Sequence, residues 1–98
     1  MNKYILSPAA KKSLRQIGNY TLKNYGTEQK KRYLRILRDT MQKAANAPEA
    51  NGKARPEIKT GYYSILSGKH TIYYRIKPEH IDIIDVLHQR MEPTNHLF

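Results

Sequence analysis

The chain lacks cysteine and tryptophan altogether, and among its 98 residues it has one phenylalanine and only eight acidic residues. The absence of cysteine excludes disulfide bonds and thiolate chemistry, and it favours a cytoplasmic location. No segment approaches the roughly 18 continuous apolar residues of a membrane-spanning helix. The apolar run near the N-terminus is too short for a signal peptide. We therefore expect one folded domain over residues 1–98, without a membrane span.

The scarcity of acids leaves a net charge of +10, because 18 residues are lysine or arginine. Residues 1–46 carry eleven of these cations against Glu28 and Asp39, a net charge of +9. Residues 47–98 carry seven cations against six acids. A field this one-sided attracts polyanions, either nucleic acid or an acidic protein. The alternative is a solvated basic surface that has no specific partner.

A short strand and a long helix are expected at the start of the chain, the strand over residues 3–6. Ser7 is a good helix cap, and Pro8 loses no needed hydrogen-bond donor in the first helical turn. Apolar residues then recur at helical spacing until about Tyr25. Gly26 should end this helix, because glycine adopts a positive φ without strain.

A second helix is expected from a cap at Thr27 to about Asn46. Since Gly26 alone separates the two helices, they should form a tight antiparallel hairpin. Two helices cannot bury both of their apolar stripes against each other, so the hairpin must lie on a sheet. The inner stripe of the second helix consists of Tyr33, Leu37, Met41 and Ala44.

The second half of the chain predicts a loop followed by a three-stranded antiparallel meander. The loop contains Pro48, Gly52 and Pro56, and loops of this length are often functional. Alternating residues in the middle strand should direct Arg75 away from the helices. The loop is expected over residues 47–60, the strands over 62–66, 70–77 and 81–87, and the turns at Ser67-Gly68 and around Pro78.

These elements together predict an α+β fold of two layers: an N-terminal strand, an antiparallel helical hairpin and the three-stranded meander, in the order β-α-α-β-β-β. The first strand should join the meander as an added strand.

Neither a metal site nor a nucleotide cofactor is expected. The four histidines are not spaced to share one face of a helix, and no cysteine supplements them. The five glycines form no phosphate-binding loop.

Cleavage of RNA without a metal is the one catalytic chemistry that the residues allow, since it needs only a base, an acid and cations around the phosphate. His88 or His70 are the candidate acid and base. A solvated role is the favoured alternative for the candidate cations, which are Arg55, Lys59, Arg75 and Arg90.

Five segments resemble one known family, in order, spacing and length. They are YILSPAAKKSL at 4–14, IGNYTLKNYG at 17–26, RPEIKTGYYS at 55–64, GKHTIYYRI at 68–76 and IDIIDVLHQRME at 81–92. This chain is similar to the ParE toxins of the RelE/ParE superfamily, which are the toxin half of type II toxin–antitoxin pairs. It departs from many members by carrying Asp85 where they have arginine.

The resemblance implies a toxin that is not an enzyme and that binds DNA gyrase, poisons it and so blocks replication. It implies neutralisation by a ParD-like antitoxin, whose tail is commonly acidic and would suit the basic helices, and a hetero-oligomer of the two proteins. The expected gyrase contacts are Arg55, Lys59, Arg75, His88 and Arg90. The expected antitoxin contacts are Lys12, Arg15, Lys31, Arg35, Arg38 and Tyr62.

Two other functions stay open. One is a ribosome-dependent mRNA endonuclease of the RelE type, which would use Arg75, His88 and Arg90. The chain lacks a C-terminal tyrosine that could serve as its acid or base, which weighs against cleavage. The other is a small basic module that binds nucleic acid and has neither activity.

Overall fold

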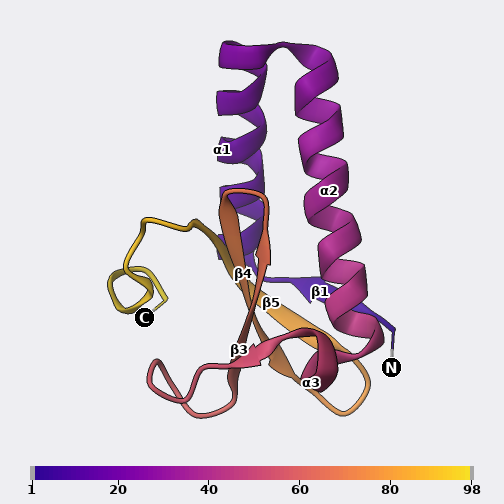
Figure 1. The fold of residues 1–98 in the computed structure, drawn as a ribbon, viewed down its shortest axis with the longest axis vertical. Helices are drawn as coiled ribbons and strands as arrows, with labels where there is room; N and C mark the ends of the chain where they lie inside the picture. Colours follow the sequence, from indigo (N-terminus) through magenta and orange to yellow (C-terminus); the bar gives the residue numbers. More distant parts are fainter. Residues whose placement is uncertain (1, 98) are drawn as a thin grey trace.

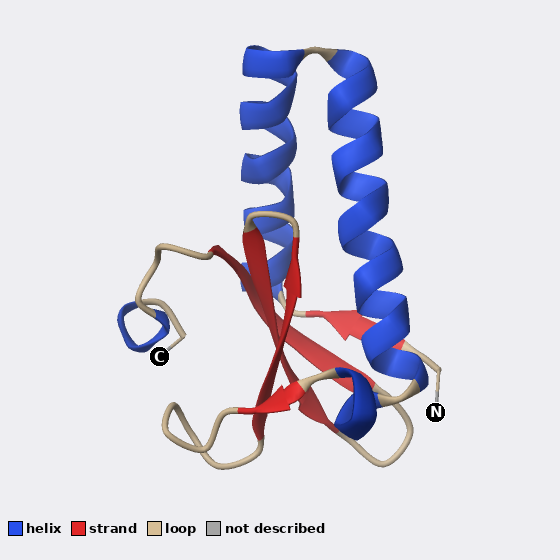
Figure 2. Ribbon diagram, in the orientation of Figure 1, coloured by secondary structure: helices blue, strands red, loops and turns tan. Residues whose placement is uncertain are grey.

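Residues 2–97 are described by a computed structural model in which two long helices stand against one face of a five-stranded sheet (Figures 1 and 2). The strand order is β1-β5-β4-β3-β2. The predicted α+β fold, with its strand, helical hairpin and antiparallel meander, is confirmed. In chain order the elements are β1 (Tyr4–Leu6), α1 (Pro8–Tyr25), α2 (Thr27–Asn46), α3 (Pro48–Asn51), β2 (Lys53–Ala54), β3 (Tyr62–Ser67), β4 (His70–Ile76), β5 (Ile81–His88) and the 3₁₀ turn η1 (Pro93–Asn95).

The predicted start and end of α1 are confirmed. The Ser7 hydroxyl oxygen accepts a hydrogen bond from the Ala10 amide at 3.0 Å, and the hydroxyl donates to the Ile84 carbonyl at 2.6 Å. This one side chain therefore caps the helix and ties it to β5. Gly26 ends α1 with a φ of 91°, as expected of glycine at this position.

The predicted cap of α2 at Thr27 is wrong. Thr27 is already the first helical residue, and Gly26 precedes the helix without a side-chain cap. Because a single residue connects the helices, no position remains between them for a separate capping side chain.

The prediction of an irregular loop over residues 47–60 is also wrong in part. The segment contains α3 and then β2, which extends the sheet by pairing antiparallel to β3. The buried Tyr74 side chain explains the order, since its hydroxyl donates to the Pro48 carbonyl at 2.6 Å. The tight turn that follows β3 lies one residue later than predicted, at Gly68 and Lys69, with a φ of 59° at Gly68.

The core lies between the helical hairpin and the near face of the sheet. Six large side chains are fully buried there: Leu37 and Met41 from α2, Ile72 and Tyr74 from β4, and Ile81 and Ile83 from β5. In β1, which is parallel to β5, Tyr4 and Leu6 pack at the edge of this core.

The prediction that β4 buries one face alone fails at one point. Tyr73 is buried on the far face, although Ile72 and Tyr74 are buried on the near face, and β4 keeps an unbroken register with β3. The register shift against β5 comes from an extra residue of β5, Ile84, which lies between the partners of Tyr73 and Tyr74. The far face is therefore partly packed.

Candidate partner-binding groove

The helical hairpin extends past the end of the sheet, and Figure 1 shows both helices continuing beyond the turn between β3 and β4. A groove of about 1080 Å³ lies where the sheet stops supporting α1. We call it the hairpin groove. Its walls come from α1, from the start of α2, from the β3–β4 turn and from the end of β5, and they include Ile17, Tyr20, Thr21, Tyr25, Tyr33, His70, Val86, His88 and Met91.

The hairpin groove exposes large apolar side chains. Tyr20 is 63% exposed, Tyr25 is 65% exposed and Met91 is 45% exposed. Tyr20 and Tyr25 are exposed because the last turns of α1 extend beyond the sheet, and Met91 follows the end of β5. A concave apolar surface with a few polar groups is typical of a binding site.

Two histidines and a tyrosine form a hydrogen-bonded cluster in this groove. The Tyr33 hydroxyl lies 2.6 Å from His70 Nδ1 and accepts a hydrogen bond from the Lys69 amide at 3.1 Å. The Tyr33 hydroxyl also lies 3.5 Å from the Ser67 carbonyl, so the tautomer of His70 decides whether the hydroxyl proton goes to His70 Nδ1 or to that carbonyl. The rings of His70 and His88 meet edge to face with centroids 5.4 Å apart.

Burial sets the protonation of this cluster. It lowers the pKa of His70, and the nearby His88 lowers that pKa further. Burial also raises the pKa of the Tyr33 hydroxyl, against a smaller opposing effect of the Lys69 amide. His88 Nδ1 accepts a hydrogen bond from the Arg90 amide at 3.2 Å.

The carboxylate of Asp85 also borders the groove, but its hydrogen bonds are internal. It accepts from the Ser13 hydroxyl at 2.6 Å and from the Val86 amide at 2.8 Å. Asp85 thus joins α1 to β5 and leaves the groove without a free acid at this point.

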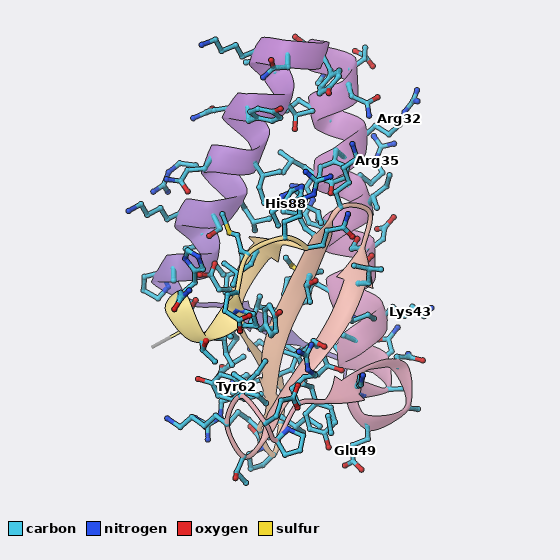
Figure 3. The ribbon with its side chains drawn as sticks, turned by 60° about the vertical axis from the view of Figure 1, so that its left-hand side comes forward. Arg32, Arg35, Lys43, Glu49, Tyr62 and His88 are labelled. Carbon is cyan, nitrogen blue, oxygen red and sulfur yellow. The ribbon has the colours of Figure 1, made fainter. Side chains whose placement is uncertain are left out.

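Of the three residues predicted for RNA cleavage, Arg90 lies beside His88, but Arg75 lies far from both. Arg75 lies opposite Asp82 in the β4–β5 ladder, whereas His88 lies opposite His70 at the other end. Five to six residues of strand separate the two positions, which is roughly 16–20 Å. In Figure 3, His88 and Tyr62, the residue that pairs with Arg75, lie towards opposite ends of the sheet.

A second cluster occupies the sheet face away from the helices. The Arg55 guanidinium lies 6.0 Å from the Tyr73 ring centroid, and Arg75 lies 5.9 Å from that of Tyr62. Arg55 also donates to Glu57 at 2.6 Å and to Ser64 at 3.1 Å. The hydrogen bond between Arg55 and Glu57 lowers the pKa of the Glu57 carboxyl and raises the pKa of the Arg55 guanidinium.

This outer cluster brings together three of the predicted gyrase contacts, Arg55, Lys59 and Arg75. Lys59 belongs to it through its carbonyl, which accepts from the Tyr62 amide at 3.1 Å. The other two, His88 and Arg90, lie beside the hairpin groove. Sequence reasoning did not select Tyr20, Tyr25, Tyr33 or Met91, although the helical spacing of Ile17, Tyr20 and Tyr25 was a readable signal.

The six predicted antitoxin contacts are divided among several surfaces. Lys12 borders the hairpin groove. Arg15 and Arg38 line a smaller pocket between the helices. Lys31 and Arg35 are exposed on α2, and Figure 3 shows Arg35 on its outer side. Tyr62 is buried in the outer cluster.

Within residues 2–97, no three histidine or acidic side chains gather as a metal ion would require. None of the helices in that range has the length and apolar character to cross a membrane.

The sequence matches the family described as ParE toxin of type II toxin-antitoxin system, parDE, over residues 4–93. It is 40% identical over 97 residues to Toxin ParE1 of two Mycobacterium tuberculosis strains, with 98% of each chain covered. It is 36% identical over 97 residues to Toxin ParE1 of Caulobacter vibrioides, with 99% of each chain covered.

Two solved structures share the fold. One is the chromosomal ParDE toxin–antitoxin system from P. aeruginosa, with a TM-score of 0.74 and 17% identity, covering 90% of this chain and 96% of that one. The other is the toxin–antitoxin complex RelBE2 from Mycobacterium tuberculosis, with a TM-score of 0.64 and 21% identity, covering 90% and 98%.

Proposed function

Because this chain belongs to the ParE family of type II toxins, we propose that it poisons DNA gyrase without being an enzyme, and that a ParD-like antitoxin neutralises it by filling the hairpin groove. The observation that carries the proposal is the unpartnered row of Tyr20, Tyr25 and Met91 along that groove.

An amphipathic helix of the antitoxin suits this groove. Such a helix buries its apolar side chains in a groove at helical spacing, and the exposed rings of Tyr20 and Tyr25 provide the complementary surface. Acidic residues beside the helix would face the cations of residues 1–46, where the net charge is +9.

Occupation of the groove also accounts for neutralisation. His88 lines the groove and Arg90 follows it in the chain, and both belong to the surface that we propose for gyrase. An antitoxin helix in the groove would cover these two residues. The outer cluster, with Arg55 and Arg75, supplies the remainder of that gyrase surface.

The separation of Arg75 from His88 favours binding over RNA cleavage. Catalysis needs the acid, the base and the phosphate-binding cation within hydrogen-bond reach of one substrate. Arg75, the predicted phosphate-binding cation of the sheet, lies about 16–20 Å from His88 and does not meet that requirement.

The test is a supercoiling and DNA-cleavage assay with purified gyrase, plasmid DNA and this protein. We expect supercoiling to fall with dose while linear DNA accumulates. His88→Ala should weaken this effect only a few-fold, whereas loss of a catalytic acid or base costs roughly 10²–10⁴-fold. An intact supercoiling rate with excess folded protein would refute the gyrase assignment. RNA cut on translating ribosomes, abolished by His88→Ala, would establish the endonuclease instead.

A further inference from the structure

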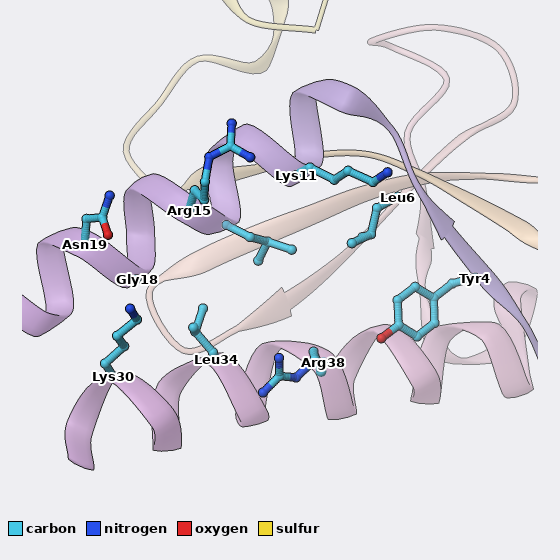
Figure 4. Close-up of a pocket in the computed structure, with 10 residues that line it drawn as sticks. Tyr4, Leu6, Lys11, Arg15, Gly18, Asn19, Lys30, Leu34 and Arg38 are labelled. Carbon is cyan, nitrogen blue, oxygen red and sulfur yellow. The ribbon is translucent and has the colours of Figure 1, made fainter. Parts of the chain in front are cut away.

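A second pocket lies between the two helices, at the side where β1 meets them (Figure 4). We call it the inter-helix pocket. It has a volume of about 330 Å³, and Leu6, Leu14 and Leu34 form its apolar part. At Gly18 the helices come so close that an added Cβ atom would lie 3.2 Å from Lys30 Cε.

Four cations surround the inter-helix pocket: Lys11 and Arg15 from α1, and Lys30 and Arg38 from α2. The residues that line it in the described part of the chain include no aspartate or glutamate. Among residues 2–97, the ion pairs are Arg55 with Glu57 and His80 with Asp82, so the positive charge of the pocket is not neutralised within that range. Four like charges around one pocket repel one another, and an anion bound between them would relieve that repulsion.

We propose that the inter-helix pocket binds the phosphate backbone of duplex DNA. This inference goes beyond the proposed function and does not depend on it.

The dimensions suit a run of phosphates. Lys30 and Arg38 are eight residues apart on α2, which is a rise of about 12 Å, and Lys11 and Arg15 are about 6 Å apart on α1. Consecutive phosphates of one DNA strand lie about 7 Å apart along the winding backbone, although the strand rises only about 3.4 Å per phosphate along the duplex axis, so the pocket spans about two of them. The concave strip between the helices complements the convex ridge of a backbone.

The composition of the pocket favours duplex DNA over a single strand or an acidic peptide. Proteins that bind single strands stack bases on several aromatic rings, and Tyr4 is the aromatic residue lining this pocket in the described chain. An acidic peptide gains most of its affinity from contacts between its apolar side chains and an apolar surface. The hairpin groove has a larger surface of this kind than the inter-helix pocket. The phosphates of duplex DNA, in contrast, would be bound by the four pocket cations alone.

The experiment is fluorescence anisotropy with a labelled 20-base-pair duplex of arbitrary sequence, between 50 and 200 mM salt. The test variant is Lys30→Gln/Arg38→Gln, which removes two pocket cations. The matched control is Lys31→Gln/Arg35→Gln, which removes one lysine and one arginine from the exposed surface of the same helix. Circular dichroism and Tm measurements verify that both variants fold.

We expect the pocket variant to lose at least ten-fold in affinity at 50 mM salt. Its slope of log K against log salt should fall by about 2, since each phosphate contact contributes about 0.9. The control should lose less than three-fold. Equal losses in the two variants would show that net charge alone acts, and would overturn the proposal.

Two further outcomes would also overturn it. One is absence of duplex binding by the unmodified protein at 50 mM salt. The other is a pocket variant that keeps its affinity for the duplex but loses affinity for poly-glutamate, which would assign the pocket to an acidic peptide.

Discussion

At the scale of single residues, Tyr74 connects the core to the segment that follows α2. Its side chain is fully buried, and its hydroxyl donates to the Pro48 carbonyl. Burial, with Tyr63 stacked nearby, raises the pKa of Tyr74 to about 12. The hydroxyl therefore stays protonated, and stays a donor, at any physiological pH.

Gly52→Ala should destabilise the fold strongly. A Cβ atom at Gly52 would lie 1.8 Å from the Tyr74 hydroxyl oxygen, so the ring must move and its hydrogen bond to Pro48 is lost. Overpacking and the lost bond together should cost about 2–4 kcal/mol of unfolding free energy, measured by urea denaturation.

Gly18→Ala is the matched control for that substitution. The nearest groups to its added Cβ atom are the flexible ends of Lys30 and Leu34, and alanine is a better helix former than glycine by about 1 kcal/mol. We expect Gly18→Ala to be neutral or stabilising. If the two variants unfold at the same urea concentration, the role assigned to Tyr74 is wrong.

His70 should make the stability depend on pH. Burial lowers its pKa below the ordinary value of 6.5, and the charge of His88 lowers it further. The unfolded chain therefore binds more protons than the folded one just below pH 6.5. Stability from this group is complete above pH 6.5 and is lost as the pH falls towards the folded pKa.

The measurement is urea unfolding at pH 7.5 and pH 5.5 for the unmodified protein and for His70→Gln. The variant should lose less stability on acidification than the unmodified protein. His96→Gln, at an exposed position outside the histidine pair, is the control and should leave the pH dependence as it was. A His70→Gln variant with unchanged pH dependence would contradict the burial argument.

At the scale of elements, the single-residue connection between α1 and α2 fixes the hairpin. Gly26 has a φ of 91° and a ψ of 176°, a conformation that belongs almost entirely to glycine, and an added Cβ would meet no atom within 4 Å. Gly26→Ala should therefore cost about 1–3 kcal/mol through backbone strain alone, as measured by thermal or urea denaturation. Gly52→Ala, by contrast, acts through a clash.

A control for the hairpin turn is Asn24→Ala, two residues earlier in α1. The Asn24 side chain donates to the Tyr20 carbonyl at an exposed site, so its loss should cost only a few tenths of a kcal/mol. If Gly26→Ala costs no more than Asn24→Ala, the connection is not strained in the way that its φ indicates.

The elements that the sequence predicted well are those with local signals. Ser7, Pro8 and Gly26 delimit α1 through their own backbone and capping chemistry, and these signals need no distant partner. In contrast, α3 and β2 depend on Tyr74, which lies 26 residues beyond Pro48. The bulge in β5 at Ile84 likewise depends on the pairing of β4 with β5, which no local pattern shows.

The candidate site was harder to predict for the same reason. Charge alone selected Lys12, Arg38 and Arg55, and the structure places them on three different surfaces. The hairpin groove arises because the helices outreach the sheet (Figure 1). The groove therefore depends on the relative lengths and placement of the helices and the sheet. Neither the apolar stripe of α1 nor the strand patterns show this when each is read alone.

At the scale of the whole molecule, the surfaces have distinct characters. The hairpin groove is apolar and aromatic, the inter-helix pocket is basic, and the outer cluster combines arginine with tyrosine. Under the proposed function, the antitoxin would contact Tyr20 and Tyr25, gyrase would contact the outer cluster, and the two partners would overlap at His88 and Arg90. We therefore expect neutralisation and toxicity to be separable by mutation.

The most direct test of that claim is the gyrase supercoiling assay, repeated with increasing amounts of the cognate antitoxin. The variant is Tyr20→Ala/Tyr25→Ala, and its control is Leu22→Ala/Ile36→Ala, which removes exposed apolar side chains outside the hairpin groove. We predict that the variant still poisons gyrase but needs at least ten-fold more antitoxin for neutralisation, while the control behaves as the unmodified protein. Equal neutralisation of variant and control would contradict the groove as the antitoxin site.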